Sequence, residues 1–550
     1  MSLYTYLTLA TALLGLIIGV NSNPLSTRSS SGPVVDLGYS KYEGTALSSG
    51  VNQYLGMRFA APPIGNLRYR APEEPLPTTD IESATEFRPV CLAMGTMLPN
   101  TGQAEDCLFA NVWCPSLATP RSKLPVWVYI QGGGYTQNGN ANYNGSTVVE
   151  TSGNNIVFVN FNYRVGSWGF LASEKVRKNG NLNAGLLDQD FLLRWVRKNI
   201  EQFGGDPNHV IIHGSSAGAG SVALHLTAYG GVDRGLFIGA IGESVFFPAQ
   251  PKIRELEWQF DRYVTNTGCS HSTDQLECLR ALDTETLQAA NVATPFPGGV
   301  SPPLFYFTPT IDGHFIQDYP YVSFGKGNFV HVPIIIGDDN DEGTFFVANA
   351  SSPADVTTFF VDNYPRLTTH DTDAINAVYP LTTPLPNHNA YFPSAAAAYG
   401  ESTFVCPGNF ISNSYATHVS YNKVWNYRYN VQIRGFIEAG YGVPHTIESA
   451  AIFGLGNVGD NPSGDAFYGY STYNANIVPV VMNYWISFIR SLNPNTYKYA
   501  SAPQWDNFGT GSDGDKRLKL ETNATAIEII PLEQVRRCEF WRKLARTMEE

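Results

Sequence analysis

The sequence has little positive charge. It carries 35 lysine and arginine residues against 48 aspartate and glutamate residues, a formal net charge of −13 over 550 residues. It has no run of basic residues and no basic patch interleaved with aromatic side chains. Because nucleic acids bind through such positive surfaces, we expect no nucleic-acid partner. Internal repeats and long low-complexity segments are also missing, which argues against a repeat architecture.

Metal-binding patterns are missing as well. No group of histidine and cysteine residues has the spacing of a zinc site. We therefore expect neither a metal ion nor an organic cofactor.

Long hydrophobic runs are missing except near the N-terminus. Leu7 to Val20 is nearly continuously apolar but short for a membrane span, and small residues follow it. This pattern predicts a signal peptide at residues 1–22 and a single domain over 23–550, in a secreted, extracellular protein. No lysine or arginine precedes the run, which leaves an uncleaved anchor as the alternative. The final segment, Lys543 to Glu550, has no hydrophobic tail, so we expect no lipid anchor there.

Cysteine is sparse, with seven residues, a number that fits an oxidising compartment. Cys91 and Cys107 bound a loop of a size that a disulfide readily closes. Three tripeptides are acceptors for N-glycosylation if the chain passes through a eukaryotic secretory pathway, and they begin at Asn144, Asn349 and Asn523.

What the sequence does contain is a large apolar fraction, 43%, enough to bury a sizeable core. Residues 23–50 are rich in serine and glycine and predict a loose segment. Beyond them, short apolar runs alternate with helical stretches, the clearest of which spans Leu186 to Ile200. The expected strands are Leu124–Ile130, Ile156–Phe161, Val210–Ile212, Leu236–Ile241, Val332–Ile336 and Val424–Tyr429. The alternation predicts an α/β fold, a large, mostly parallel, twisted sheet covered by helices on both faces.

The run from Val210 to Val222 reads as strand, sharp turn and helix, with Ser216 at the turn. Glycines two positions before and after the serine suit a turn in which a side chain would collide with its neighbours. In a chain with 51 glycines this motif alone is weak evidence for a catalytic serine. An ordinary strand-to-helix turn of small residues explains it equally well.

Two other loops also follow predicted strands. Gly132, Gly133 and Gly134 come after the first strand, and four acidic residues lie between Gly337 and Gly343. Because the carboxyl ends of parallel strands meet at one edge of a sheet, these loops and Ser216 should converge.

Several long motifs, in order along the chain, resemble those of type-B carboxylesterases and lipases, a branch of the α/β-hydrolases that includes secreted fungal lipases and cholinesterases. They are the three glycines at 132–134, Glu105 to Asn111, Gly180 to Gln189 and Phe203 to Pro207. Motifs in register over most of the chain are far more specific than one pentapeptide. The resemblance implies the α/β-hydrolase fold and carboxylic-ester hydrolysis.

The resemblance also implies a catalytic triad. A serine needs a base to take its proton and a carboxylate to orient that base. The residues alone do not choose among Asp338, Asp339, Asp341 and Glu342; the family's motif selects Glu342, with Asp341 as runner-up and the others as a solvated polar loop. The same reasoning selects His445, and His370, His388 and His418 resemble nothing catalytic.

The resemblance assigns the oxyanion donors to the backbone N–H groups of Gly133, Gly134 and Ala217. It also implies the disulfides Cys269–Cys278 and Cys406–Cys538 besides Cys91–Cys107. Cys114 then stays unpaired, and we expect it to be a buried apolar residue.

The sequence departs from the family at three points. Ser215 stands before the nucleophile where many relatives carry glutamate, and Gln131 stands before the glycines where related esterases often carry histidine. The loop from Leu92 to Asp106 is too short for a sizeable lid helix and has no aromatic residue. We therefore expect an enzyme for small or soluble esters, without interfacial activation or choline selectivity. Separately, we expect no stable membrane anchor.

Two alternatives remain open. The first is a lipase or sterol esterase for long acyl chains, with Phe246-Phe247 and Phe305 to Phe307 lining an acyl pocket rather than the core. The second is a binding protein of the same fold, which a complete triad disfavours.

Overall fold

The structure is a computed structural model, and it describes residues 32–100, 102–459, 467–509 and 514–550. The predicted signal peptide, residues 1–22, lies outside the described residues.

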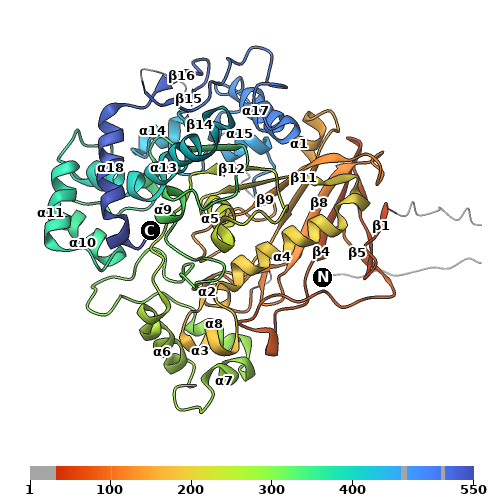
Figure 1. The fold of residues 1–550 in the computed structure, drawn as a ribbon, viewed down its shortest axis with the longest axis horizontal. Coiled ribbons are helices and arrows are strands. Elements are labelled where there is room, and N and C mark those ends of the chain that lie inside the picture. Colours follow the sequence, from red (N-terminus) through yellow and green to blue (C-terminus); the bar gives the residue numbers. More distant parts are fainter. Residues whose placement is uncertain (1–31, 101, 460–466, 510–513) are drawn as a thin grey trace, which may run out of the picture.

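A twisted sheet runs through the middle of the molecule (Figure 1). In the described part of the chain it has 11 strands, in the order β16-β15-β14-β13-β12-β11-β9-β10-β8-β4-β3. Every neighbouring pair from β15 to β10 is parallel, and the pairs at both edges are antiparallel. The bounds are β3 Thr45–Ala46, β4 Val51–Arg58, β8 Phe109–Pro115, β9 Leu124–Ile130, β10 Val157–Phe161, β11 Gly205–Ser215, β12 Gly239–Glu243, β13 Ile334–Asp339, β14 Val424–Tyr429, β15 Lys516–Leu520 and β16 Ala526–Ile529. The predicted parallel sheet is confirmed.

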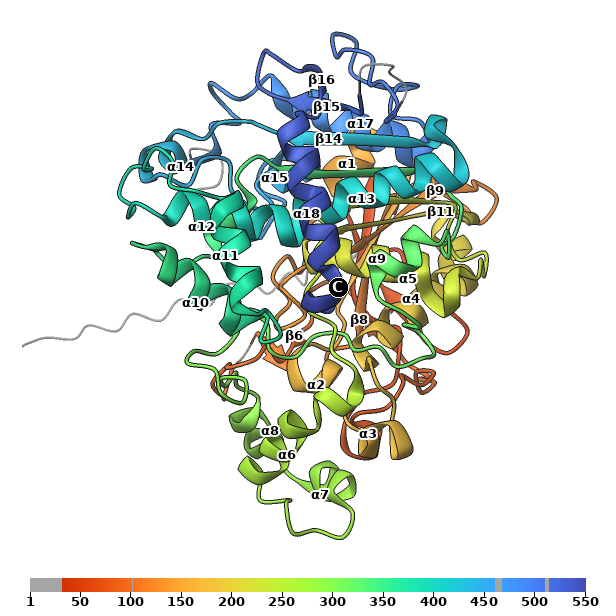
Figure 2. The same cartoon turned by 60° about the vertical axis from the view of Figure 1, so that its left-hand side comes forward.

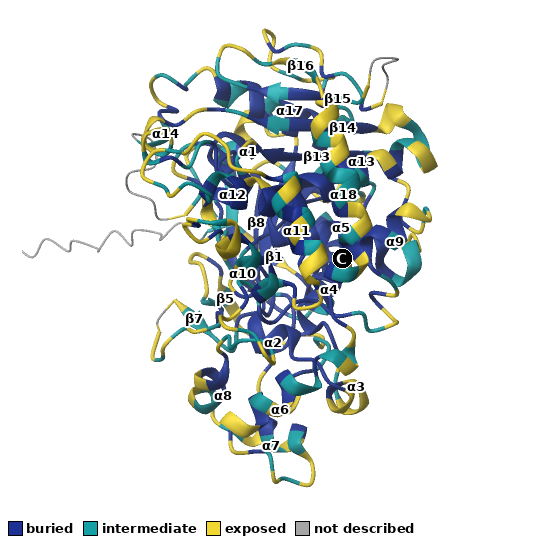
Figure 3. Ribbon diagram, turned by 90° about the vertical axis from the view of Figure 1, so that its left-hand side faces the viewer, coloured by how far each residue is buried: buried dark blue, intermediate teal, exposed yellow. Residues whose placement is uncertain are grey.

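Side chains alternate between the two faces of the sheet and enter two different cores. In β9, Val126 and Val128 join the core under α4 (Ala184–Asn199) and α5 (Ala217–Gly231), while Trp127 and Tyr129 join the core under α17 (Ile477–Ser491). Both faces are therefore covered, as a parallel sheet requires. Colouring by burial shows dark blue strands in the interior and exposed residues on the outer faces of helices and on loops (Figure 3).

Strand boundaries agree with the sequence where apolar residues continue to the strand's end. β9 and β14 have the predicted limits, whereas β11 begins earlier, at Gly205, and β13 continues past Ile336 to Asp339. Neither extension is an apolar run, because residues 205–209 are Gly-Asp-Pro-Asn-His and residues 337–339 are Gly-Asp-Asp. A hydrophobic pattern does not assign such residues to a buried strand.

The expectation of a loose segment over residues 23–50 is wrong for its described part. β1 (Val34–Asp36) and β2 (Lys41–Glu43) pair with each other, and β5 (Ile81–Ser83) pairs with β2 in a second, three-stranded sheet. Val35 and Tyr42 are buried in the core that also lies under α4 and α5, so they anchor this segment.

The remaining helices cover the sheet or project from it. In Figure 2, α6, α7 and α8 lie together at the end of the molecule far from β14 to β16, and α18 runs beside α13. Their bounds are α1 Ser146–Thr151, α2 Gly166–Phe170, α3 Glu174–Asn179, α6 Glu257–Asn266, α7 Gln275–Ala281, α8 Thr284–Ala290, α9 Pro320–Gly325, α10 Pro353–Asn363, α11 Thr369–Val378, α12 Phe392–Gly400, α13 Cys406–Tyr415, α14 Arg434–Ala439, α15 Ser449–Phe453 and α18 Leu532–Met548. None of the helices described has the length and apolar character that a membrane crossing needs.

Three disulfides join the pairs that the sequence and the family resemblance indicate: Cys91–Cys107, Cys269–Cys278 and Cys406–Cys538. Cys114 is free and buried, as expected. Burial raises the pKa of its thiol to about 12, so at neutral pH it stays protonated.

Candidate active site

Ser216 stands at a sharp turn between β11 and α5, as the sequence predicts. Its φ of 58° and ψ of −125° are rare for a residue with a side chain, so the surrounding structure must hold it. A Cβ atom on Gly214 would lie 2.2 Å from the Gly218 carbonyl oxygen, and one on Gly218 would lie 2.0 Å from that of Ile130. Both glycines are therefore required by close backbone packing.

Glu342 and His445 are hydrogen-bonded to each other through Glu342 Oε2 and His445 Nδ1. Glu342 comes shortly after β13 and is buried, and its Oε1 accepts from the Ser244 hydroxyl at 2.6 Å and from the Asp339 N–H at 2.7 Å. The carboxylate is thus fixed from three sides. Because it accepts a hydrogen bond from Nδ1, it selects the imidazole tautomer in which Nε2 is free to accept a proton.

His445 Nε2 is buried and has no hydrogen-bond partner among the described residues. The rings of Phe404 and Phe346 pack against the imidazole, with centroids 4.3 and 5.0 Å away. Ser216 and His445 are therefore not hydrogen-bonded to each other here. Such bonds often tighten only when substrate is bound.

The link between the serine and the Glu342–His445 pair runs through the end of β12. The Ser216 N–H donates to the Glu243 carbonyl oxygen at 2.8 Å, and Ser244, the next residue, donates its hydroxyl to Glu342. Sequence reasoning missed Ser244. The available signal was its position directly after a strand at the edge where the other loops converge.

The runner-up acid, Asp341, has a different role. Its Oδ2 accepts from the Val443 N–H at 2.8 Å, so it holds the loop that carries His445. Of the other histidines considered, His370 and His418 are exposed and His388 is half-buried.

The expectation that Asp338 and Asp339 belong to a solvated loop is wrong. Both are 1% exposed, because β13 continues through them between β12 and β14. Burial raises the pKa of both carboxyls well above the ordinary value.

Two further buried glutamates lie near this edge. Glu243 receives hydrogen bonds from His213 Nε2 at 2.5 Å and Trp485 Nε1 at 3.1 Å. Burial raises its pKa and lowers that of His213, so both groups favour their neutral forms. Burial raises the pKa of Glu448 to about 7. Ser215, in the position where many relatives carry glutamate, is fully buried.

The loop that contains Gly132, Gly133 and Gly134, called the glycine loop below, lies against Ser216. A Cβ atom on Gly132 would be 2.8 Å from the Ser216 Cβ, so the loop and the turn are in direct contact. Gly133 and Gly134 have φ values of 109° and 64°, in the left-handed region that favours glycine. Ala217 is the first residue of α5, directly after the serine. The three residues assigned as oxyanion donors thus belong to two segments that meet at Ser216.

A large, mostly parallel sheet, helices on both faces and a serine in a tight strand-to-helix turn define an α/β-hydrolase. The sequence profile described as "Carboxylesterase family" matches residues 31–541. The chain therefore belongs to the carboxylesterase family, and it is a carboxylic-ester hydrolase.

Individual relatives agree with this assignment. The chain is 30% identical to lipase 4 of Diutina rugosa, with 94% of this chain and 95% of the relative covered. It is 28% identical to secreted lipase 4 of Gibberella zeae, with 92% of each covered. It is 30% identical to the acetylcholinesterase of Bungarus fasciatus, with 90% and 83% covered.

Among solved structures, the crystal structure of Aspergillus niger EstA is similar over almost the whole fold. The TM-score is 0.92 at 54% sequence identity, and the match covers 94% of this chain and 99% of that chain.

Proposed function

We propose that the protein is a secreted serine carboxylesterase in which Ser216, His445 and Glu342 form the catalytic triad. The observation that carries the proposal is the Glu342–His445 hydrogen bond. It leaves a buried Nε2, without a partner among the residues that the structure describes, at the sheet edge that also holds Ser216. A buried imidazole nitrogen without a partner is unfavourable unless another group uses it. Accepting the serine proton is such a use.

The reaction proceeds in two steps. The Ser216 Oγ attacks the ester carbonyl carbon while its proton moves to His445 Nε2, and the N–H groups of Gly133, Gly134 and Ala217 stabilise the oxyanion. The intermediate collapses, and the alcohol leaves with the proton from His445. Water then attacks the acyl-enzyme, giving its proton to His445, and the acid leaves as Ser216 regains its proton.

We propose small or soluble esters as substrates, and aromatic packing beside the triad supports this. The Phe246 ring packs on Phe305 at 4.6 Å and on Phe404 at 5.6 Å, and Phe404 contacts His445. A Cβ atom on Gly134 would lie 2.0 Å from the Phe305 ring, so these rings fill the space next to the glycine loop. A long acyl chain would have to displace them.

The loop between Cys91 and Cys107 is consistent with the same preference. In its described residues it forms two-residue strands, β6 (Val90–Cys91) and β7 (Gln103–Ala104), and no helix. A short loop that is closed by a disulfide does not supply a mobile amphipathic lid.

Secretion is supported by the three disulfides, which persist in oxidising compartments, and by relatives that are named secreted lipases. We propose N-glycosylation at Asn349 and Asn523, which are exposed, and at Asn144, which is half-buried. The Asn144 side chain accepts the Ser146 N–H, so a glycan there must tolerate a local turn.

The test is hydrolysis of p-nitrophenyl esters with acyl chains from two to sixteen carbons by wild type and Ser216→Ala. We expect short chains to be cleaved and Ser216→Ala to lose about a million-fold in kcat. Cleavage of long chains alone would favour the lipase alternative. A folded wild type that cleaves no ester in the series would contradict the proposed function.

A further inference from the structure

The glycine loop is held in place mainly from outside itself. Its internal hydrogen bonds run from the N–H groups of Thr136 and Gln137 to the Gly133 carbonyl and from Gly139 to Gly132, all at 3.1 Å. These bonds fix the shape of the turn. They do not fix where the turn lies relative to Ser216, which stands on a different strand.

Bonds to neighbouring segments set that position. The Met94 N–H, from the loop closed by the Cys91–Cys107 disulfide, donates to the Thr136 carbonyl at 2.8 Å, and the Gly166 N–H donates to the Tyr135 carbonyl at 2.8 Å. Both are backbone bonds, which a substitution does not remove directly. Asn138 makes two further bonds through its side chain.

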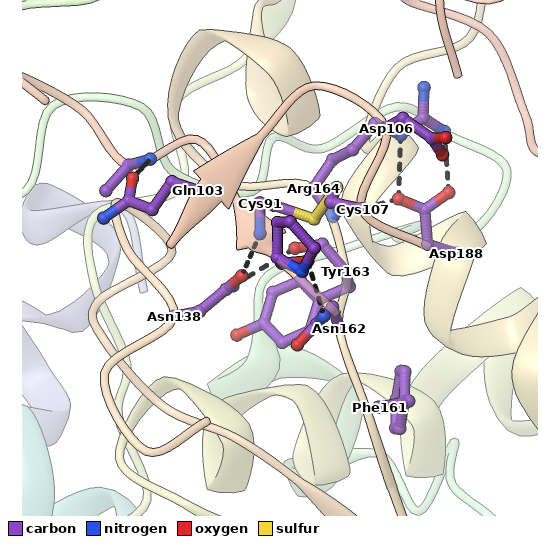
Figure 4. The surroundings of a disulfide bond; sticks show 12 residues. Cys91, Gln103, Asp106, Cys107, Asn138, Phe161, Asn162, Tyr163, Arg164 and Asp188 are labelled. Atoms are coloured by element: carbon purple, nitrogen blue, oxygen red, sulfur yellow. Dashed lines mark hydrogen bonds and ion pairs between the residues drawn. A yellow bond between two sulfur atoms is a disulfide. The ribbon is translucent and has the colours of Figure 1, made fainter. Parts of the chain in front are cut away.

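The Asn138 amide bridges two separate segments (Figure 4). Its Oδ1 accepts the Cys91 N–H at 2.8 Å, and its Nδ2 donates to the Tyr163 carbonyl oxygen at 3.2 Å, just beyond the end of β10. The side chain is half-buried, and its acceptor and its donor are both used. The disulfide that begins at Cys91 fixes one of the two segments to the other end of its loop at Cys107.

We infer that Asn138 is a positioning residue for the oxyanion donors, an inference that rests on the proposed function. It does not touch the reacting atoms. It fastens the end of the loop that carries Gly133 and Gly134 to the disulfide loop on one side and to the end of β10 on the other. Gly133 and Gly134 have left-handed backbones with little intrinsic preference for this geometry, so an external clamp determines where their N–H groups point.

The inference predicts a loss specific to the transition state. An oxyanion donor interacts most strongly with charge that develops after attack, so a displaced donor lowers kcat more than it raises KM. Removing one donor outright costs about a hundredfold to a thousandfold. Loosening the clamp should cost less, about tenfold to a hundredfold.

The experiment compares Asn138→Ala with Gln137→Ala in the full chain. Gln137 is the exposed neighbour on the same loop, which makes it the matched control. kcat and KM are measured on a short p-nitrophenyl ester, and the inhibition constant is measured for a small aryl trifluoromethyl ketone. Ser216 adds to the ketone carbonyl and its proton moves to His445, so the adduct carries an oxyanion without a leaving group.

We expect Asn138→Ala to lose kcat and ketone affinity by similar factors, with KM within about twofold of wild type, while Gln137→Ala retains both. Asn138→Asp keeps the acceptor for the Cys91 N–H and should retain more activity than the alanine variant. It also provides the comparison if the alanine variant is poorly folded.

Two outcomes would overturn the inference. One is a kcat and ketone affinity for Asn138→Ala, or for Asn138→Asp if the alanine variant does not fold, equal to those of Gln137→Ala. The other is a loss confined to KM. A wild type that hydrolyses no ester and is not labelled at Ser216 by a fluorophosphonate would instead overturn the proposed function, and the inference with it.

Discussion

The two sides of the candidate site are built from different chemical groups. The side that holds His445 is formed by the ends of β12, β13 and β14 and is rich in buried carboxyl groups. The side that holds the glycine loop presents backbone N–H groups fixed by neutral amides, Gln131 and Asn138. The buried carboxyl groups are Glu243, Asp338, Asp339, Glu342 and Glu448.

This difference separates the two tasks of ester hydrolysis. In the proposed mechanism, titratable groups gather where a proton has to be accepted and returned, and neutral dipoles gather where negative charge develops. The first side should therefore respond to pH, and the second should not. Each prediction below tests one side, in order of decreasing expected effect on activity.

The largest effect should follow Glu342→Gln. The amide can present a donor to His445 Nδ1 and so favour the wrong imidazole tautomer, which lowers kcat by about ten-thousandfold in a comparable triad. Initial rates on a two-carbon p-nitrophenyl ester measure the loss. Asp341→Asn is the control and should lose far less, since its amide oxygen still accepts the Val443 N–H. Equal losses in the two variants would contradict the assignment of the acid.

The next effect should follow Gly134→Ala. The new Cβ would strain a residue at φ 64° and meet the Phe305 ring at 2.0 Å, so the loop must move. We expect about a hundredfold to a thousandfold loss in kcat, equal at every pH between 6 and 9. Gly38→Ala has the same left-handed backbone with open space around it, and it should keep full activity. A loss in kcat that varies with pH would contradict the expectation that only the carboxyl-rich side responds to pH.

A smaller effect should follow Ser244→Ala. The variant loses the 2.6 Å hydrogen bond to Glu342 Oε1 and keeps the one from the Asp339 N–H. A hydrogen bond to a charged group contributes about 1.5–3 kcal/mol, so kcat should fall by about tenfold to a hundredfold. Ser215→Ala, another buried serine, is the control. A kcat for Ser244→Ala equal to that of Ser215→Ala would show that the bond does not position the carboxylate.

The smallest effect on activity and the clearest on stability should follow Glu448→Gln. The carboxyl has an ordinary pKa of 4.5 and a folded-state pKa of about 7, so the unfolded chain releases this proton at lower pH than the folded protein does. Its raised pKa therefore lowers wild-type stability as pH rises from about 4.5 to 7, by up to about 3 kcal/mol.

Denaturant unfolding of wild type and Glu448→Gln at pH 5 and pH 7.5 measures how much Glu448 contributes to the pH dependence of the free energy of unfolding. The variant should lose less stability over the interval than wild type does. Glu438→Gln, at an exposed position, should follow wild type. Equal losses in the free energy of unfolding of Glu448→Gln and wild type between pH 5 and pH 7.5 would mean that this carboxyl is ionised in the folded protein at both pH values.

The sequence predicted those elements that depend only on residues close together along the chain. β9, β14 and the serine turn follow from apolar runs and from glycines whose absent side chains leave room for neighbouring backbone. The acidic residues after Ile336 could not be sorted in the same way. Whether a carboxylate there is solvated or buried depends on β12 and β14, which pair with β13 and are distant in sequence.

The same limit applies to contacts between segments. The roles of Ser244 and Asn138 depend on partners that lie far along the chain, Glu342 for one and Cys91 for the other. A lone serine or asparagine carries no pattern that would single it out. The family resemblance indicated the proposed triad through short motifs that contain its residues, whereas Ser244 and Asn138 lie in no motif of that kind.

The Cys406–Cys538 disulfide has a consequence for the covalent connectivity of the active site. It closes a ring of chain that contains His445, while Ser216 and Glu342 lie outside the ring. One peptide-bond cut inside the ring leaves a single covalent molecule. One cut between Glu342 and Cys406 yields two separate polypeptides, with Ser216 and Glu342 of the proposed triad on the first and His445 on the second. Under conditions that separate fragments not joined covalently, a single cut between Glu342 and Cys406 would therefore part His445 from the other two residues. A single cut inside the ring would leave all three on one covalent molecule.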